Sequence, residues 1–146
     1  MIIGMSQPDD LSIERTTDLE LSADEMWSLI STAEGWSAWL VDEAHIAVQP
    51  DAEGTATEDG VVREVHIDTV EEGRGITFSW WDRDDPSSAS YVQMQIVELP
   101  DGRSQLHIAE QFIGASTATM TAEAALSWDV RMLSLWLLAL HCTVMA

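Results

Sequence analysis

Glu110 occupies the position best suited to chemistry in this sequence. It continues an alternating series with Leu106, Ile108 and Phe112. Because side chains alternate between the two faces of a strand, these residues share one face, and the apolar members direct that face inward. A carboxylate held there would be partly desolvated and could act as a general acid or base, or as a polar anchor for a ligand. In the alternative interpretation, Glu110 lies at the end of its strand, where it is solvated or paired with an arginine.

His66 is the second catalytic candidate. Glu64 and Asp68 lie two residues away on either side, and a histidine beside a carboxylate can shuttle protons. The apolar pattern of residues 61–70 changes parity around Ile67, which indicates a β-bulge. The pattern therefore does not decide on which face of the sheet His66 lies. A surface histidine on an acidic strand is the alternative. With only these two candidates, a binding protein is favoured over an enzyme.

Aromatic side chains recur at positions expected to face the interior. They would line an apolar cavity for a ring-containing or lipid-like ligand, or they simply fill the core. A buried tryptophan must also place its indole N–H on an acceptor, and Glu110 is one such acceptor. The predicted ligand-binding residues are Trp36, Trp39, Phe78, Trp80, Met94, Ile108, Glu110, Phe112, Trp128, Arg131, Met132 and Leu135.

Two arginines are further polar candidates. Six arginines and no lysine stand against 26 acidic residues, so the net charge is −20 and each arginine is expected to have a carboxylate neighbour. Arg63 and Arg131 would then form structural ion pairs. If Arg131 lies near Trp128 on its helix, it could instead clamp a ligand carboxylate.

The charge and the missing motifs exclude several classes of function. A charge of −20 would repel a phosphate backbone and an anionic membrane surface, so nucleic acid is not an expected partner. The single Cys142 cannot form an internal disulfide, and no Cys/His group has zinc-ligand spacing. Gly73-Arg-Gly75 is a hairpin turn rather than a phosphate loop, so neither metal nor cofactor is expected. The first residues lack the features of a signal peptide, which favours a cytoplasmic location.

The hydrophobic periods predict one domain over residues 11–146 after an N-terminal tail of residues 1–10. A capping box at Ser22–Glu25 begins the first helix, and Gly35 is expected to end it. Polar loops are expected over 82–88 and 114–121, and turns over 50–54, 71–74 and 100–102. The predicted elements are a strand over 11–21, helices over 22–35 and 36–40, strands over 44–48, 61–70, 76–80, 92–96 and 106–112, and a long helix from Ala122 to about Cys142.

This order predicts an α+β fold. A sheet with one apolar face and a single long apolar helix can bury both only if the sheet curves around the helix. Trp128, Met132, Leu135 and Ala139 are expected to face the antiparallel sheet. Such packing leaves a cavity wherever the facing side chains do not fill the space.

In order and spacing these residues resemble the SRPBCC superfamily, which has the START-like, Bet v-like helix-grip fold, and most closely its activator-of-Hsp-ninety-ATPase homologue-like family. The resemblance spans Ser12 to Ala139, although the second glycine of the family's Pro-Gly-Gly turn is absent. The matching pieces are Met26-Trp27-x-x-Ile30 followed by Trp39, Pro50 to Gly54, Val70 to Trp80 with Arg74, Ile76 and Phe78 between, Ser104-x-Leu106-x-Ile108-x-Glu110, and Trp128 near the start of the last helix.

The resemblance implies a domain that binds a hydrophobic small molecule in a cavity under the last helix. A polyketide cyclase or aromatase-like enzyme that uses acid/base groups in the cavity is the alternative. Two or more titratable groups within hydrogen-bond reach of each other there would favour the enzyme, and an isolated Glu110 would favour the binder. A chaperone-associated interaction domain is the third possibility.

The last helix also predicts a homodimer. Between Val130 and Ala146, 13 of 17 residues are apolar, which is more than one stripe against a sheet requires. Leu133, Trp136, Leu137 and Leu140 fall on other faces, and an exposed patch of this kind usually marks an interface. The alternative is that the first helices and the 114–121 loop cover them. A membrane span is not expected, because charged residues interrupt the run.

Overall fold

The computed structural model describes residues 12–113 and 118–145, and the side chains of residues 12–113 and 121–140. The tail expected over residues 1–10 and the side chain of Cys142 lie outside these ranges. The elements in chain order are β1 (Ser12–Leu19), α1 (Ala23–Ile30), α2 (Ala33–Trp39), β2 (Glu43–His45), β3 (Glu53–Glu58), β4 (Val61–Glu71), β5 (Gly75–Asp82), β6 (Asp85–Glu98), β7 (Ser104–Phe112) and α3 (Ala118–Met145).

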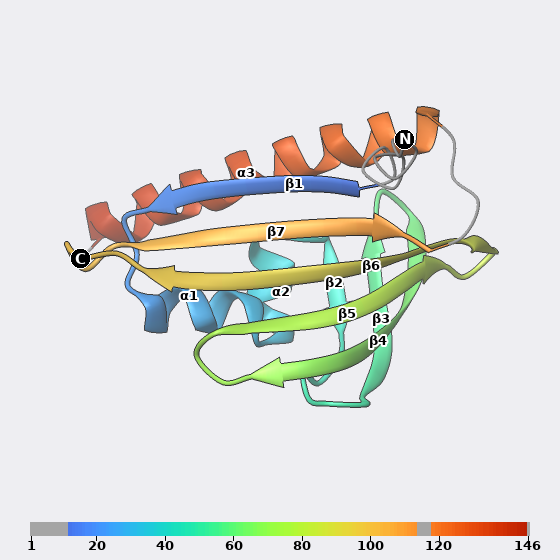
Figure 1. Cartoon of the computed structure of the whole chain (residues 1–146), viewed down its shortest axis with the longest axis horizontal. Coiled ribbons are helices and arrows are strands. Elements are labelled where there is room, and N and C mark those ends of the chain that lie inside the picture. The colour runs from blue at the N-terminus through green and yellow to red at the C-terminus, as the bar shows by residue number, and fades with distance from the viewer. Residues whose placement is uncertain (1–11, 114–117, 146) are drawn as a thin grey trace, which may run out of the picture.

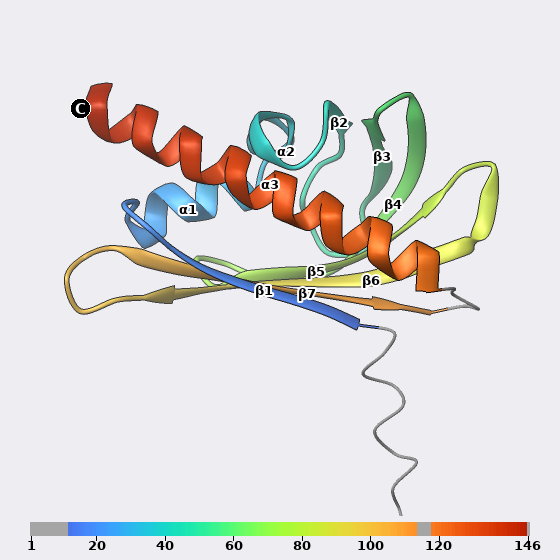
Figure 2. The same ribbon diagram turned by 90° about the horizontal axis from the view of Figure 1, so that it is seen from above.

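The strands form one antiparallel sheet in the order β1-β7-β6-β5-β4-β3-β2 (Figure 1). In Figure 2 the long α3 crosses one side of this sheet, α1 and α2 lie on the same side, and β3 and β4 curve up beside them. The predicted helix-grip architecture, a curved antiparallel sheet around a long last helix, is confirmed. Trp128, Leu135 and Ala139 are buried toward the sheet, as expected, and Met132 is partly buried against the same core.

The start of α1 is the predicted capping box. The Ser22 hydroxyl accepts a hydrogen bond from the Glu25 N–H at 3.1 Å, and the Glu25 carboxylate accepts one from the Ser22 N–H at 2.9 Å. These two bonds satisfy backbone donors that the first helical turn leaves free.

The prediction that Gly35 ends the first helix is wrong. α1 ends at Ile30, and Gly35 lies inside α2. A Cβ on Gly35 would lie 2.5 Å from the Leu29 carbonyl oxygen, so glycine is needed for the close approach of the two helices. The indole N–H groups of Trp36 and Trp39 then donate to the carbonyls of Ile30 and Leu29 at 2.8 and 3.0 Å, which satisfies acceptors at the end of α1.

One strand is absent from the sequence prediction. β3 occupies residues expected to lie between two strands, and it pairs with β2 and β4. Asp59 and Gly60 join β3 to β4 with positive φ angles of 52° and 80°. Two positive φ angles are the requirement of a tight type I′ hairpin turn, for which Asp-Gly is a preferred sequence.

Two loop boundaries also differ from the prediction. β6 begins at Asp85, so the loop expected over 82–88 shortens to a tight hairpin connection. α3 begins at Ala118, inside the loop expected over 114–121, of which residues 114–117 lie outside the described ranges. The predicted bulge in β4 is confirmed, because the register with β5 shifts between Ile67 and Thr69. No described helix is long and apolar enough to span a membrane.

Candidate functional site

Glu110 faces the interior, as its alternation with apolar neighbours predicts, and is 4% exposed. Its Oε2 accepts a hydrogen bond from the Trp80 indole N–H at 3.0 Å and another from the Ser90 hydroxyl. Its Oε1 accepts from the Trp128 indole N–H at 2.7 Å. One carboxylate on β7 therefore joins β5, β6 and α3.

These partners determine what Glu110 can do. All three donors are neutral, and no titratable side chain within the described ranges hydrogen-bonds to this carboxylate. The bonds also satisfy two buried indole N–H groups, which would otherwise destabilise the core. The geometry is that of a polar anchor rather than of a paired acid and base.

Two arginines lie against Trp80. The Arg63 Cζ on β4 lies 4.4 Å from the Trp80 ring centroid, and the Arg131 Cζ on α3 lies 5.3 Å from it. Arg131 also lies over Trp128, at 4.5 Å. Guanidinium groups at these distances are attracted by the negative faces of indole rings.

Arg131 is fully engaged by the protein. Its side chain is 4% exposed, its Nε donates to the Leu40 carbonyl at 3.0 Å, and its Nη2 donates to the Glu58 carboxylate. It therefore holds α3 to the end of α2 and to β3. The structural ion pair expected for Arg131 is present, and because the side chain is 4% exposed, little of its surface is accessible to a ligand.

The positive charge of Arg63 is less well neutralised by nearby carboxylates than that of Arg131. Its contact with an acceptor within the described ranges is Nη1 to Glu58 Oε1 at 3.4 Å, and the same oxygen accepts from Arg131. Burial and the charge of Arg131 lower the pKa of Arg63, although Glu58 and Glu110 partly oppose this. The environment therefore disfavours a charge that the side chain nevertheless carries at neutral pH.

Arg63, Trp80, Glu110 and Arg131 line a pocket of about 590 Å³. We call it the Trp80 pocket. Figure 2 shows the β5–β6 hairpin and the start of α3, which bound it, at the same end of the molecule. The other lining residues are the apolar Val61, Phe112, Ala124 and Leu126, the hydroxyl-bearing Ser88, Ser90 and Ser127, and the acidic Asp59, Asp82, Asp85 and Glu123.

The lining residues that reach the surface include four carboxylates, with the exposed apolar side chains of Val61 and Leu126 beside them. Asp59, Asp85 and Glu123 are exposed and Asp82 is partly exposed, whereas Trp80, Ser90, Glu110 and Arg131 are buried. We call these four carboxylates the acidic rim. The Trp80 pocket thus combines an aromatic and arginine-bearing floor with a negatively charged entrance.

The structure divides the predicted ligand-binding residues between pocket and core. Trp80, Glu110, Phe112 and Arg131 line the Trp80 pocket. Trp39 lies at a smaller cavity of about 380 Å³ on the other side of Arg131, and Met132 is partly buried against the core. Trp36, Phe78, Met94, Ile108, Trp128 and Leu135 are buried in the core, where Trp36 and Phe78 pack with ring centroids 4.8 Å apart.

A second cavity of similar volume, about 610 Å³, lies around the turn between β4 and β5. Met94 contributes to its wall, with Thr69, Thr77 and Gln93. None of the described aromatic residues lines this cavity. We therefore do not assign it to a ligand with rings.

His66 lies apart from the Trp80 pocket. It is on the outer face of β4, with its Nε2 3.7 Å from Asp51 and 3.8 Å from Asp68. Glu64, the other expected partner, pairs with Arg83 at 2.6 Å. The two catalytic candidates, Glu110 and His66, are therefore not brought together.

Sequence reasoning missed the positions of Arg63 and Ser90 at the pocket. Alternation along the strands indicates their inward direction, because Arg63 shares a face with the buried Val65 and Ile67, and Ser90 shares a face with the buried Val92. Their meeting at Trp80 depends on the pairing of β4, β5 and β6. Within the described ranges, no group of three or more His, Cys, Asp and Glu residues could hold a metal ion.

No family model matches the sequence, and no curated protein matches it. Three solved structures of similar fold are protein MLL2253 from Mesorhizobium loti, DynU16 and the Aha1 dimer from Colwellia psychrerythraea. MLL2253 is 16% identical with a TM-score of 0.75, and the match covers 87% of this chain and 95% of that one. DynU16, described as a putative protein in the dynemicin biosynthetic locus, is 15% identical with a TM-score of 0.73, over 86% of this chain and 45% of that one.

The Aha1 dimer is 13% identical with a TM-score of 0.73, and the match covers 86% of this chain and 92% of that one. At these identities the likeness is one of fold. The expected resemblance to helix-grip structures, an Aha1 protein among them, is confirmed for the fold.

Proposed function

We propose that this domain binds a small molecule with an aromatic or other apolar part in the Trp80 pocket. The observation that carries the proposal is the composition of that pocket. Phe112, Val61, Ala124 and Leu126 supply apolar surface above the buried Trp80 ring, while Ser90, Glu110 and Arg63 place polar groups around the same space. Ligand sites typically combine apolar walls with a few polar groups, and a volume of about 590 Å³ lies within their usual range.

Binding is favoured over catalysis. A cyclase-like enzyme, the alternative that the resemblance implies, would need a second titratable group in hydrogen-bond reach of Glu110. Within the described ranges Glu110 is bonded to two tryptophans and a serine instead. This arrangement supports a site that holds a molecule rather than one that transfers its protons.

Native mass spectrometry of protein purified from its own host tests the proposal. Ala124 lines the Trp80 pocket from α3, so Ala124→Trp would occupy part of its volume. Ala122 is exposed on the same helix and does not line the pocket, so Ala122→Trp is the matched control. We expect the wild-type protein and the control to retain a bound mass that Ala124→Trp loses. A wild-type protein without bound mass, or equal retention by both variants, would overturn the proposal.

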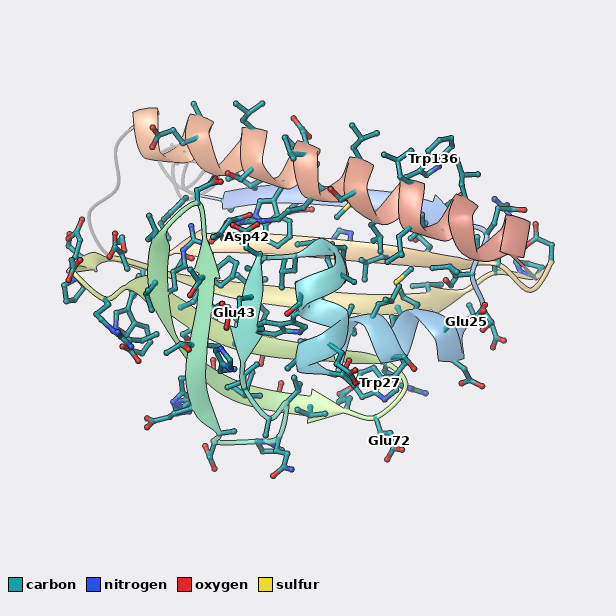
Figure 3. The ribbon with its side chains drawn as sticks, turned by 180° about the vertical axis from the view of Figure 1, so that it is seen from behind. Glu25, Trp27, Asp42, Glu43, Glu72 and Trp136 are labelled. Atoms are coloured by element: carbon teal, nitrogen blue, oxygen red, sulfur yellow. The ribbon has the colours of Figure 1, made fainter. Side chains whose placement is uncertain are left out.

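We further propose that two copies associate through α3. Leu126, Val130, Leu133, Leu137 and Leu140 follow one another at spacings of four, three, four and three residues, and they are 39–65% exposed. We call them the outer stripe. This spacing is that of a helix–helix seam on the exposed side of α3. At its first residue, Leu126, the outer stripe adjoins the Trp80 pocket, which Leu126 also lines. Figure 3 shows Trp136, which is 48% exposed, projecting from α3 on the side away from α1 and α2.

A second copy is the occupant that the outer stripe fits best. A two-fold axis lets one apolar stripe cover its own counterpart, which is how most soluble homodimers bury such a surface. The five side chains of the outer stripe and Trp136 together offer roughly 600 Å² per protomer, against about 800 Å² per partner in a standard interface. The Colwellia protein of similar fold, whose structure is that of a dimer, supports the pairing of two copies.

Sedimentation equilibrium at micromolar concentration measures this association. We expect a dimer for the wild-type chain and a monomer for Leu133→Glu, because a carboxylate in the centre of the stripe would be buried without a partner. Val97→Glu is the control, since Val97 is 47% exposed on β6, away from α3. A monomeric wild-type protein, or a dimer that survives Leu133→Glu, contradicts the proposal.

A further inference from the structure

We propose that Arg63 anchors an anionic group of the ligand, so that the Trp80 pocket takes an apolar or aromatic carboxylate. This inference rests on the proposed binding function and adds the chemical class of the molecule. It assigns to Arg63 the role that the sequence analysis considered for Arg131.

The first support is the position of Arg63. Its side chain is 29% exposed, lines the pocket and lies over the Trp80 ring. A guanidinium that lies against an indole ring keeps N–H donors available for hydrogen bonds beside the ring. The planar fork of these donors matches the two oxygens of a carboxylate.

The second support is the shortage of opposite charge around Arg63. Three other arginines make ion pairs of 2.6–2.8 Å, with Asp129, Glu64 and Asp101 as their partners. Arg63 has a 3.4 Å contact with Glu58, which is already engaged by Arg131. Arg74 also forms no ion pair within the described residues, but it is exposed to solvent, whereas Arg63 is partly buried and has no carboxylate of its own.

A nearby carboxylate does not fill this role. Asp82 is the cross-strand neighbour of Arg63 in the pairing of β4 with β5, yet the structure places no ion pair between them. Asp82 Oδ1 instead accepts a hydrogen bond from the Asp84 N–H at 2.8 Å, within the hairpin connection. The donors of Arg63 that do not face Glu58 are therefore open to a carboxylate from outside the chain.

Electrostatics supports the same assignment. Burial and the charge of Arg131 lower the pKa of Arg63, which means that its surroundings do not fully compensate its positive charge. An anion bound beside it would supply the missing compensation. The apolar side chains of Phe112, Val61 and Leu126 around the same space favour an anion attached to a ring or hydrocarbon part over an inorganic ion.

Three naphthalene probes of similar size separate charge from shape: 2-naphthoate, 2-naphthol and 2-naphthylmethylammonium. At pH 7 they are an anion, a neutral molecule and a cation. Isothermal titration calorimetry should find that 2-naphthoate binds at least about tenfold more tightly than 2-naphthol, because a charge-assisted bidentate pair is stronger than a neutral hydrogen bond. The cation should bind most weakly of the three.

Substitution of the arginine identifies the anchor. Arg63→Gln should bring the affinity for 2-naphthoate down to that for 2-naphthol and leave the affinity for 2-naphthol within about twofold, since only the anion loses a partner. Arg83→Gln removes an arginine that pairs with Glu64 and does not line the pocket, so it is the matched control and should change neither affinity. Urea denaturation of both variants verifies that each remains folded.

The possible results distinguish this inference from the proposed function. If none of the three probes binds and no ligand co-purifies with the protein, the proposed function itself fails. If 2-naphthol binds as tightly as 2-naphthoate, or if Arg63→Gln weakens both probes equally, the pocket stands and the role of Arg63 is wrong. Selective loss of 2-naphthoate binding in Arg63→Gln establishes the anionic class.

Discussion

Glu110 accepts hydrogen bonds from three other elements, so its effect on stability should exceed that of an ordinary acidic residue. In Glu110→Gln, one carboxylate oxygen becomes an NH₂ group that cannot accept. Either Trp128 or the pair Trp80 and Ser90 then faces a donor instead of an acceptor. We expect the free energy of unfolding in urea to fall by about 1–3 kcal/mol, the magnitude for a buried donor left unpaired.

Glu98→Gln is the control for this measurement, because Glu98 is exposed at the end of β6 and its side chain forms no hydrogen bond within the described residues. It should change the stability by less than about 0.5 kcal/mol, as surface substitutions usually do. Equal effects of the two substitutions would show that the Glu110 bonds contribute little.

Removing the charge should lower the stability strongly at Arg131 and change it little at Arg63. Arg131→Met leaves the Leu40 carbonyl and most of the Glu58 carboxylate without their donor, and we expect it to lower the stability by about 2–4 kcal/mol. Arg63→Met removes a charge that burial disfavours, so its stability should remain within about 1 kcal/mol of the wild type. Urea denaturation of both variants measures the difference, and a larger loss in Arg63→Met would contradict this description of the site.

At the level of the elements, close contact between α1 and α2 depends on Gly35. A Cβ there would lie 2.5 Å from the Leu29 carbonyl oxygen, and a backbone atom cannot move aside as a side-chain end can. Gly35→Ala should therefore lower the stability by about 2 kcal/mol or more, although alanine is the better helix former by about 1 kcal/mol. Thermal unfolding followed by circular dichroism measures this loss of stability. Glu34→Ala, on an exposed position of α2, should be nearly neutral, and a stable Gly35→Ala would refute the contact.

The same glycine shows what sequence patterns can and cannot predict here. Alternation correctly predicts the inward face of Glu110 and the bulge near Ile67, because both depend on neighbours within one strand. Gly35 was expected to end a helix, since a glycine needed for close packing and one that ends a helix look alike in one sequence. The Asp59-Gly60 turn carried the signal for the missing strand, but β3 itself has little apolar alternation.

At the level of the whole molecule, the two ends of the space under α3 differ. Trp36, Phe78 and Met94 fill the middle of the core, so the predicted cavity remains at the end bounded by the β5–β6 hairpin and the start of α3. The composition predicts a core rich in aromatic residues, but not where the packing stops. That point depends on the pairing of β4, β5 and β6, which places Arg63 and Ser90 beside Trp80.

If the Trp80 pocket takes an anion at Arg63, the acidic rim should slow its approach. Asp59, Asp82, Asp85 and Glu123 surround the entrance of a chain whose net charge is −20, so an approaching anion is repelled before it meets the arginine. Salt shortens the range of this repulsion from about 30 Å at 0.01 M to about 8 Å at 0.15 M. In stopped-flow fluorescence, the association rate constant of 2-naphthoate should therefore rise with ionic strength, while that of 2-naphthylmethylammonium falls. A rate constant for 2-naphthoate that falls with salt would mean that Arg63, and not the rim, governs the approach.

With a repulsive entrance and an attractive floor, the pocket would load slowly and release slowly, which suits a carrier that retains its molecule more than one that exchanges it quickly.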